Sequence, residues 1–244
     1  LEYRPLLVLD YHSPVTISWT DYIFWPWYSQ HGHGYSPDEP VARDLAEGWA
    51  DHTQTLAGGS FRDIYAYDTL PKAQNWIYGA CGILSFVMEI GEQCWYAGAD
   101  VDTIAARVAR GSTWLVDRAL DGPGIRGRVT GAPGDVPLAA EVQIAEMHQD
   151  FVGPRLCDPV SGHFQRLTRP GTFTLTVSCE GYQPQTRTVT VGAGWAVADV
   201  TLEPVVTGVD DPGAGDPDAD PAAAASWLRG DRRVHGGATV RLAL

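Results

Sequence analysis

The stretch Ile83-Leu84-Ser85-Phe86-Val87-Met88-Glu89-Ile90 decides the fold of the first half of this chain. An apolar run of this length, rich in Ile, Phe and Val, predicts a strand buried on both faces of a sheet. Glu89 lies near the end of the run, where an unpartnered buried carboxylate would be costly. We therefore expect Glu89 either to serve a metal, a bound water or a base partner, or to lie at a solvated strand end beside an arginine.

A second apolar run, Leu6 to Leu9, predicts another strand and leads into Asp10-Tyr11-His12-Ser13. In open α/β sheets, ligands bind outside the carboxyl ends of the strands. A neutral imidazole at His12 suits a metal, and Asp10 is the kind of group that fixes the orientation of such a ring. The alternative for His12 is an ordinary surface histidine.

Together with Trp76-Ile77-Tyr78, these segments resemble the second half of the catalytic domain of the zinc metallocarboxypeptidases, the family of carboxypeptidase A. In that family an Asp-x-His-Ser segment supplies the third zinc ligand. A later Trp-x-Tyr segment runs into a strand that ends in Glu-Leu or a close variant. The resemblance implies that residues 1–120 form the C-terminal part of an α/β catalytic domain, a mixed sheet with flanking helices.

The resemblance also implies roles for individual residues. His12 would be a zinc ligand, Glu89 the general base, and Ser13 would help to hold the peptide near the cleaved bond. Tyr67, 22 residues before Glu89, corresponds to the mobile tyrosine that closes over substrate. Gln74 falls at the base of the pocket for the substrate's C-terminal side chain; the carboxypeptidase N, E and D branch, which removes C-terminal Lys or Arg, has Gln there.

Several departures from the family limit what the chain can do alone. The His-x-x-Glu motif that supplies the other zinc ligands does not occur in the sequence, so we expect those ligands upstream of Leu1. With one ligand in place of three, zinc would not be held. Asn75 replaces the usual Asp before Trp76, and Pro14 follows Ser13. We expect the chain to be a fragment that is inactive by itself.

Helical periodicity in the first half of the chain gives way, after residue 120, to the alternating periodicity of strands. Residues 100–120 predict a helix with Asp100 as N-cap and Gly111 as an interruption, and residues 41–56 predict an earlier one. The hinge 121–124 follows, and then short strands are predicted at 125–129, 141–144, 162–167, 173–179, 186–191 and 196–202. This pattern predicts an antiparallel β-sandwich.

The phrases Arg169-Pro170-Gly171-Thr172-Phe173 and Glu180-Gly181-Tyr182 resemble the carboxypeptidase regulatory-like, or transthyretin-like, domain. In the carboxypeptidases this sandwich directly follows the catalytic domain, and we assign it to residues 125–204. Residues 205–226 predict a flexible acidic linker. Residues 227–244 resemble the start of a bacterial C-terminal sorting or anchoring domain.

Composition sets further limits. A net charge of −13, with 17 scattered Lys and Arg, argues against nucleic-acid binding. The longest apolar runs are too short to span a bilayer. The four cysteines, Cys81, Cys94, Cys157 and Cys179, fit either disulfides within each half or free thiols, and their pairing stays open. We expect a secreted, extracellular or periplasmic protein of bacterial type.

Three functions remain as hypotheses. The first is a zinc (Zn²⁺) metallocarboxypeptidase that hydrolyses C-terminal residues from peptides or proteins. The second is a catalytically silent relative that binds peptides or surfaces. The third is a zinc amide hydrolase acting on a small acylated amino acid or a cell-wall peptide. The preferred C-terminal residue and the oligomeric state are left open by the sequence.

Overall fold

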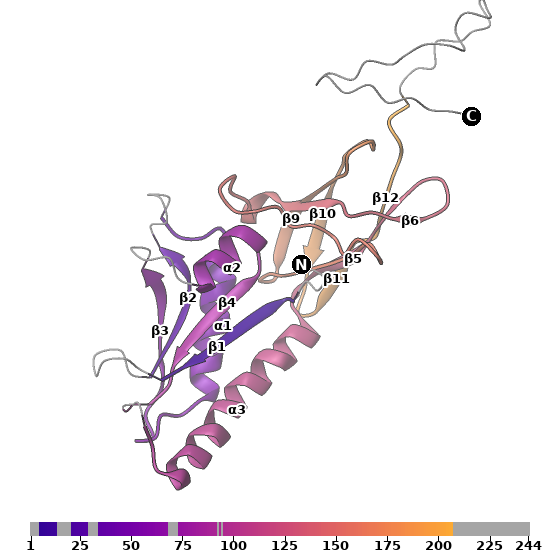
Figure 1. Cartoon of the computed structure of the whole chain (residues 1–244). Coiled ribbons are helices and arrows are strands. Elements are labelled where there is room, and N and C mark those ends of the chain that lie inside the picture. The colour runs from indigo at the N-terminus through magenta and orange to yellow at the C-terminus, as the bar shows by residue number, and fades with distance from the viewer. Residues whose placement is uncertain are drawn as a thin grey trace, which may run out of the picture. The chain divides into compact units, whose positions relative to one another are not determined.

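A computed structural model describes residues 5–13, 21–28, 34–67, 73–91, 93 and 95–206, without the side chains of 28 and 64–67 (Figure 1). Residues up to Val205 form one compact unit. Most of the predicted linker, from residue 207, and the predicted C-terminal segment 227–244 lie outside the described residues. No helix within the described part is long and apolar enough to cross a membrane.

The first half is built on a mixed sheet. Its strands are β1 (Leu7–His12), β2 (Tyr22–Tyr28), β3 (Arg62–Tyr67) and β4 (Leu84–Glu89). The order across the described sheet is β1-β4-β2-β3. β1 runs parallel to β4, and β2 runs parallel to β3, whereas β2 and β4 are antiparallel. The structure confirms the prediction that the chain combines helices with sheets.

The helices cover the sheet with apolar faces. The helix α1 (Glu39–His52) buries Val41, Ala42, Leu45, Ala46, Trp49 and Ala50, and α3 (Gly98–Asp121) packs against it. The helix α2 (Ala73–Cys81) packs against β4 and β2. Residues 84, 86 and 88 of β4 are buried in the same cluster as α1, because alternate residues of a strand face one side of the sheet.

The boundaries of both helices differ from the sequence prediction. The first helix ends at His52 rather than residue 56, because Thr53 has extended backbone angles. The long helix begins at Gly98 with Ala97 as N-cap, so Asp100 was wrongly predicted to be the cap. Asp100 instead lies in the first turn, where a carboxylate interacts favourably with the helix dipole.

The second half consists of short strands. These are β5 (Gly124–Gly131), β6 (Val136–Pro137), β7 (Glu141–Ile144), β8 (His163–Leu167), β9 (Gly171–Ser178), β10 (Gln185–Val191), β11 (Trp195–Val197) and β12 (Val200–Leu202), with a 3₁₀ helix at Ala145–Met147. One described sheet has the order β10-β9-β7 and is antiparallel. The other is centred on β5, with β6 and β8 antiparallel to it.

The strand predicted at 196–202 is split in two. Both β11 and β12 run parallel to β5, so this sheet is not wholly antiparallel. The break falls at Ala198 and Asp199, where the Asp199 carboxylate accepts a hydrogen bond from the backbone N–H of Arg128 at 2.9 Å. The side chain of Asp199 thus takes the place of a ladder bond at the break.

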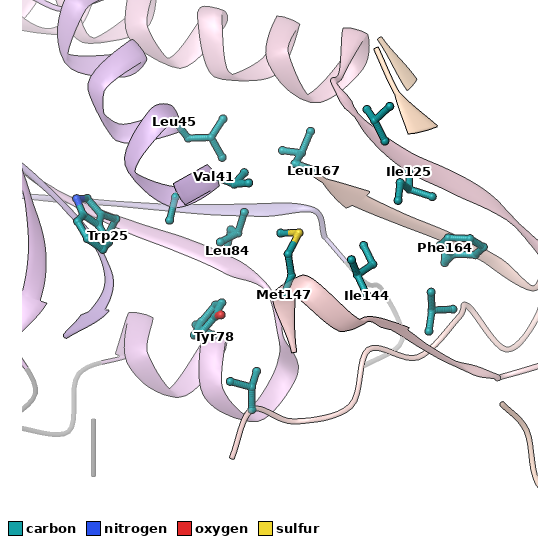
Figure 2. Packing of buried hydrophobic residues seen from close by; sticks show 14 of the residues in the cluster. Trp25, Val41, Leu45, Tyr78, Leu84, Ile125, Ile144, Met147, Phe164 and Leu167 are labelled. Carbon is teal, nitrogen blue, oxygen red and sulfur yellow. The ribbon is translucent and has the colours of Figure 1, made fainter. Parts of the chain in front are cut away.

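One hydrophobic core runs through both halves (Figure 2). It joins Leu45 of α1 and Tyr78 of α2 to Ile125, Ile144 and Leu167 of the second half. The predicted hinge at 121–124 is a short connection from α3 to β5, and the Arg118 guanidinium donates to the carbonyls of Pro123 and Thr168. Cys81, Cys157 and Cys179 are free thiols, and Cys94 lies outside the described residues.

Candidate functional site

His12 and Glu89 are register partners at the carboxyl ends of the parallel strands β1 and β4. Their backbones are held together by a hydrogen bond from the N–H of Ile90 to the carbonyl of His12, at 2.9 Å. Partners on neighbouring strands lie about 4.8 Å apart and point to the same face of the sheet. The structure therefore places His12 and Glu89, the two residues that the sequence singled out, next to each other at one edge and on one face of the sheet.

The same row continues across the sheet. Glu89 is the register partner of Tyr22 on β2, and Tyr22 is the partner of Arg62 on β3. The Arg62 guanidinium lies over the Tyr22 ring, 4.5 Å from its centroid, in cation–π geometry. We call the four residues His12, Glu89, Tyr22 and Arg62 the strand-end row. Sequence reasoning missed Tyr22 and Arg62, because their membership depends on strand order and register.

Asp10 orients the ring of His12. Its Oδ2 lies 3.0 Å from Nε2 of His12, with both side chains roughly half exposed. Residues 10 and 12 face the same side of β1, so this contact follows from strand geometry. A proton held on Nε2 by Asp10 leaves the lone pair of Nδ1 for a metal. His12 thus fits one metal-ligand position, and the predicted function of Asp10 has the geometry it requires.

The other ligands of a zinc site do not come from the described residues. Within the described part of the chain, no group of three or more His, Cys, Asp or Glu side chains is arranged to hold a metal ion. A protein zinc site takes three or four side-chain ligands. The described residues can supply one ligand, His12, of such a site.

Ser13 follows β1 directly and is exposed. With Tyr11 and His12 it lines a groove of about 530 Å³ whose opposite wall is the apolar side of α3, including Val101, Ile104 and Val108. The hydroxyls of Tyr11 and Ser112 lie 2.5 Å apart, and this contact ties β1 to α3. A mostly apolar groove beside the strand-end row is a suitable place for a side chain of a bound molecule.

The remaining predicted site residues are placed less directly. Tyr67 is the last residue of β3, and its side chain lies outside the described part. Gln74 is buried in the first turn of α2. Of the Trp-x-Tyr segment, Trp76 is exposed, whereas Tyr78 is fully buried and donates a hydrogen bond to Asp38 at 2.7 Å. This segment therefore contributes to the core as well as to the surface.

Asp21 supports the strand-end row from the side. It is buried at the start of β2, with φ of 57°, and its carboxylate accepts a hydrogen bond from the N–H of Gly91 at 2.9 Å. Gly91 itself has φ of 84°, which glycine adopts without steric cost. This hydrogen bond holds the chain that follows Glu89 against the start of β2, and so it holds the sheet edge on which the strand-end row lies.

Comparison with known proteins gives no family assignment. No protein-family model matches the chain, and no curated protein does. Among solved structures, one similar chain is a protein of unknown function from Bacteroides fragilis, at 23% sequence identity and a TM-score of 0.25. The aligned part covers 35% of this chain and 29% of that one, so the chain spans about a third of this neighbour. The assignment of function therefore depends on the site itself.

Proposed function

We propose that the strand-end row belongs to a zinc-dependent metallocarboxypeptidase, with His12 as a zinc ligand and Glu89 as general base. The observation that carries this proposal is the register pairing of His12 with Glu89, with Asp10 against the imidazole. On the same proposal, residues 1–120 are part of the catalytic domain and residues 125–204 its transthyretin-like sandwich. The protein would be secreted and would act on peptide or protein C-termini.

The chemistry follows from the two side chains. When bound, zinc polarises a scissile carbonyl and lowers the pKa of a coordinated water. The Glu89 carboxylate is held on a buried strand, so it stays in place while it accepts a proton from the attacking water and delivers it to the leaving amine. Ser13 holds the peptide near the cleaved bond, Gln74 contributes to the pocket for the terminal side chain, and Tyr67 closes over substrate.

The test uses the longest gene product that contains this chain. Release of C-terminal Arg or Phe from blocked dipeptides is measured with zinc content in parallel. Glu89→Gln is expected to lower turnover by about 10² to 10⁴ with zinc still bound, which is the usual contribution of a general base. His12→Ala is expected to lose zinc and activity together. The exposed Glu203→Gln is the matched control.

Two results would overturn the proposal. If the wild-type protein holds zinc but cleaves only small acylated amino acids or cell-wall peptides, the site is that of a zinc amide hydrolase. If neither zinc nor hydrolysis is found, while peptides still bind, the protein is a silent relative with a binding function.

A further inference from the structure

A second cavity, of about 720 Å³, lies away from the strand-end row. Its apolar walls come from Leu6, Ile83 and Leu84 on one side and from Val142, Leu156 and Phe164 on the other. Three guanidinium groups also line it, those of Arg126, Arg155 and Arg166. Ligand sites in proteins typically combine such apolar walls with a few fixed polar groups.

Arg155 is fixed in this cavity with one donor group unused. Its Nη2 donates to Oδ2 of Asp38 at 2.7 Å, and the side chain is only 12% exposed. Its Nη1 is buried and has no hydrogen-bond partner among the described residues. A Cβ added to Gly82 would lie 1.7 Å from this Nη1, so Arg155 occupies space that only glycine leaves. A buried donor without a partner is costly, and a bound acceptor would remove that cost.

The charges around Arg155 favour an acceptor that is negatively charged. A single carboxylate, Asp38, serves both Arg155 and Arg166, the latter at 2.6 Å. Burial lowers the pKa of Arg155, and the positive charge of Arg166 lowers it further. Arg126, which is exposed, lies over the Trp195 ring at 5.7 Å. Arg155 and Arg166 thus share one carboxylate, so the guanidinium groups carry more positive charge than Asp38 balances.

The acidic residues of the cavity limit the charge of the ligand. Asp158 accepts hydrogen bonds from the backbone N–H groups of Val160 and Ser161, and Asp199 accepts from that of Arg128. Both therefore hold turns of the chain, yet they remain negative charges beside the cavity. A ligand with one negative charge meets less repulsion than a dianion such as phosphate.

We propose that this cavity binds a small monocarboxylate with an apolar body, whose carboxylate accepts hydrogen bonds from Arg155 Nη1 and from Arg126. Guanidinium groups match the planar geometry of a carboxylate, and such charge-assisted hydrogen bonds are the stronger ones. The apolar body lies against the aliphatic and aromatic walls. The ligand is either a free organic acid or the C-terminus of a peptide, since both present the same group.

The experiment is isothermal titration of the full chain with 4-phenylbutyrate, and with 4-phenylbutanamide as the neutral control. A ligand of this size is expected to bind with a Kd of about 1 mM. Arg126→Gln is expected to weaken binding of the acid about tenfold, as is Arg155→Lys, which keeps the charge beside Asp38. The exposed Arg110→Gln, on α3, is the matched control. A dipeptide ending in Phe, with a free or an amidated C-terminus, separates the two sources of carboxylate.

Cys81 gives a second readout, because its thiol is free, part-exposed and lines the same cavity. Bound 4-phenylbutyrate is expected to slow the reaction of Cys81 with an aromatic disulfide reagent, measured in a background in which the other three cysteines are replaced: Cys94→Ser, Cys157→Ser and Cys179→Ser. Binding of the acid with protection of Cys81 supports the proposal. Equal binding of acid and amide, no binding at about 10 mM, or unchanged affinity in both arginine variants overturns it.

Discussion

Oδ1 of Asp38 accepts a hydrogen bond from Nη2 of Arg166 at 2.6 Å, although the two residues lie 128 positions apart in the chain. The other carboxylate oxygen accepts from Arg155 at 2.7 Å and from the Tyr78 hydroxyl at 2.7 Å. Asp38 is only 2% exposed and directly precedes α1. This buried network therefore connects the start of α1 and α2 to β8, which carries Arg166, and to the segment between β7 and β8 that carries Arg155.

Asp38→Asn should destabilise the fold strongly, because it leaves two buried guanidinium groups without a counter-charge. The expected loss in the free energy of unfolding is about 3–5 kcal/mol. Urea unfolding followed by tryptophan fluorescence measures it. The control is Asp44→Asn, since Asp44 pairs with Arg169 at an exposed position and such pairs contribute about 0–1 kcal/mol. Equal losses in the two variants would show that burial adds nothing to the Asp38 network.

The stability contributed by Asp38 should disappear in acid. Burial raises the pKa of this carboxyl, but the charges of Arg166 and Arg155 and the hydrogen bonds from Tyr78 and Arg166 outweigh burial and hold the pKa below its ordinary value of 3.8. A group whose pKa is lowered by folding stabilises the folded state above its unfolded-state pKa. That stability is lost as the pH falls through the lowered pKa.

The difference in urea midpoint between wild type and Asp38→Asn should therefore narrow as the pH is lowered from about 6 to about 3. Only the wild-type protein loses this contribution on protonation, since asparagine does not titrate. A difference that stays constant over this range would contradict the lowered pKa.

Sequence patterns predicted the elements of this fold better than their arrangement. The strand β4 and the start of β1 were correctly placed, because continuous apolar runs are a local signal. The strand β1 was predicted to stop after Leu9, but it continues to His12. The meeting of His12 and Glu89 was also foreseeable, since parallel strands end at the same edge. Which strands are neighbours is not local information, so Tyr22 and Arg62 were missed. Asp38 and its arginines, 117 and 128 positions away, leave no local pattern at all.

Gly111 has a packing reason that only the structure shows. In the sequence it interrupts a helix, whereas in the structure it is buried where α3 meets α1. A Cβ at this position would lie 2.0 Å from Oγ1 of Thr53 and 2.9 Å from the Trp49 ring. The glycine therefore allows close packing of two helices, which periodicity alone does not show.

Gly111→Ala should lower the free energy of unfolding by about 1–3 kcal/mol, the cost of overpacking a core. This loss is expected even though alanine favours a helix by up to about 1 kcal/mol over glycine. Thermal unfolding measures the loss. The control variant is Gly98→Ala, because nothing lies within 4 Å of a Cβ at this first residue of α3. Stabilisation by Gly111→Ala would mean that the two helices separate at no cost.

On the proposed zinc-binding function of His12, Asp10→Ala should weaken zinc binding without affecting the fold. The substitution removes the acceptor that lies 3.0 Å from His12 Nε2, so the ring loses its fixed orientation and tautomer. Loss of such a supporting carboxylate typically costs about 10–100-fold in metal affinity. Because Asp10 is roughly half exposed, little change in melting temperature is expected.

The measurement is zinc competition against a chromophoric chelator, in the longest gene product that contains this chain. Asp102→Ala, at an exposed position on α3, is the control. If His12→Ala abolishes zinc binding while Asp10→Ala leaves it unchanged, Asp10 does not position the ligand. If a carboxylate orients a zinc-binding histidine, both variants must lose zinc affinity, with a smaller loss in Asp10→Ala than in His12→Ala.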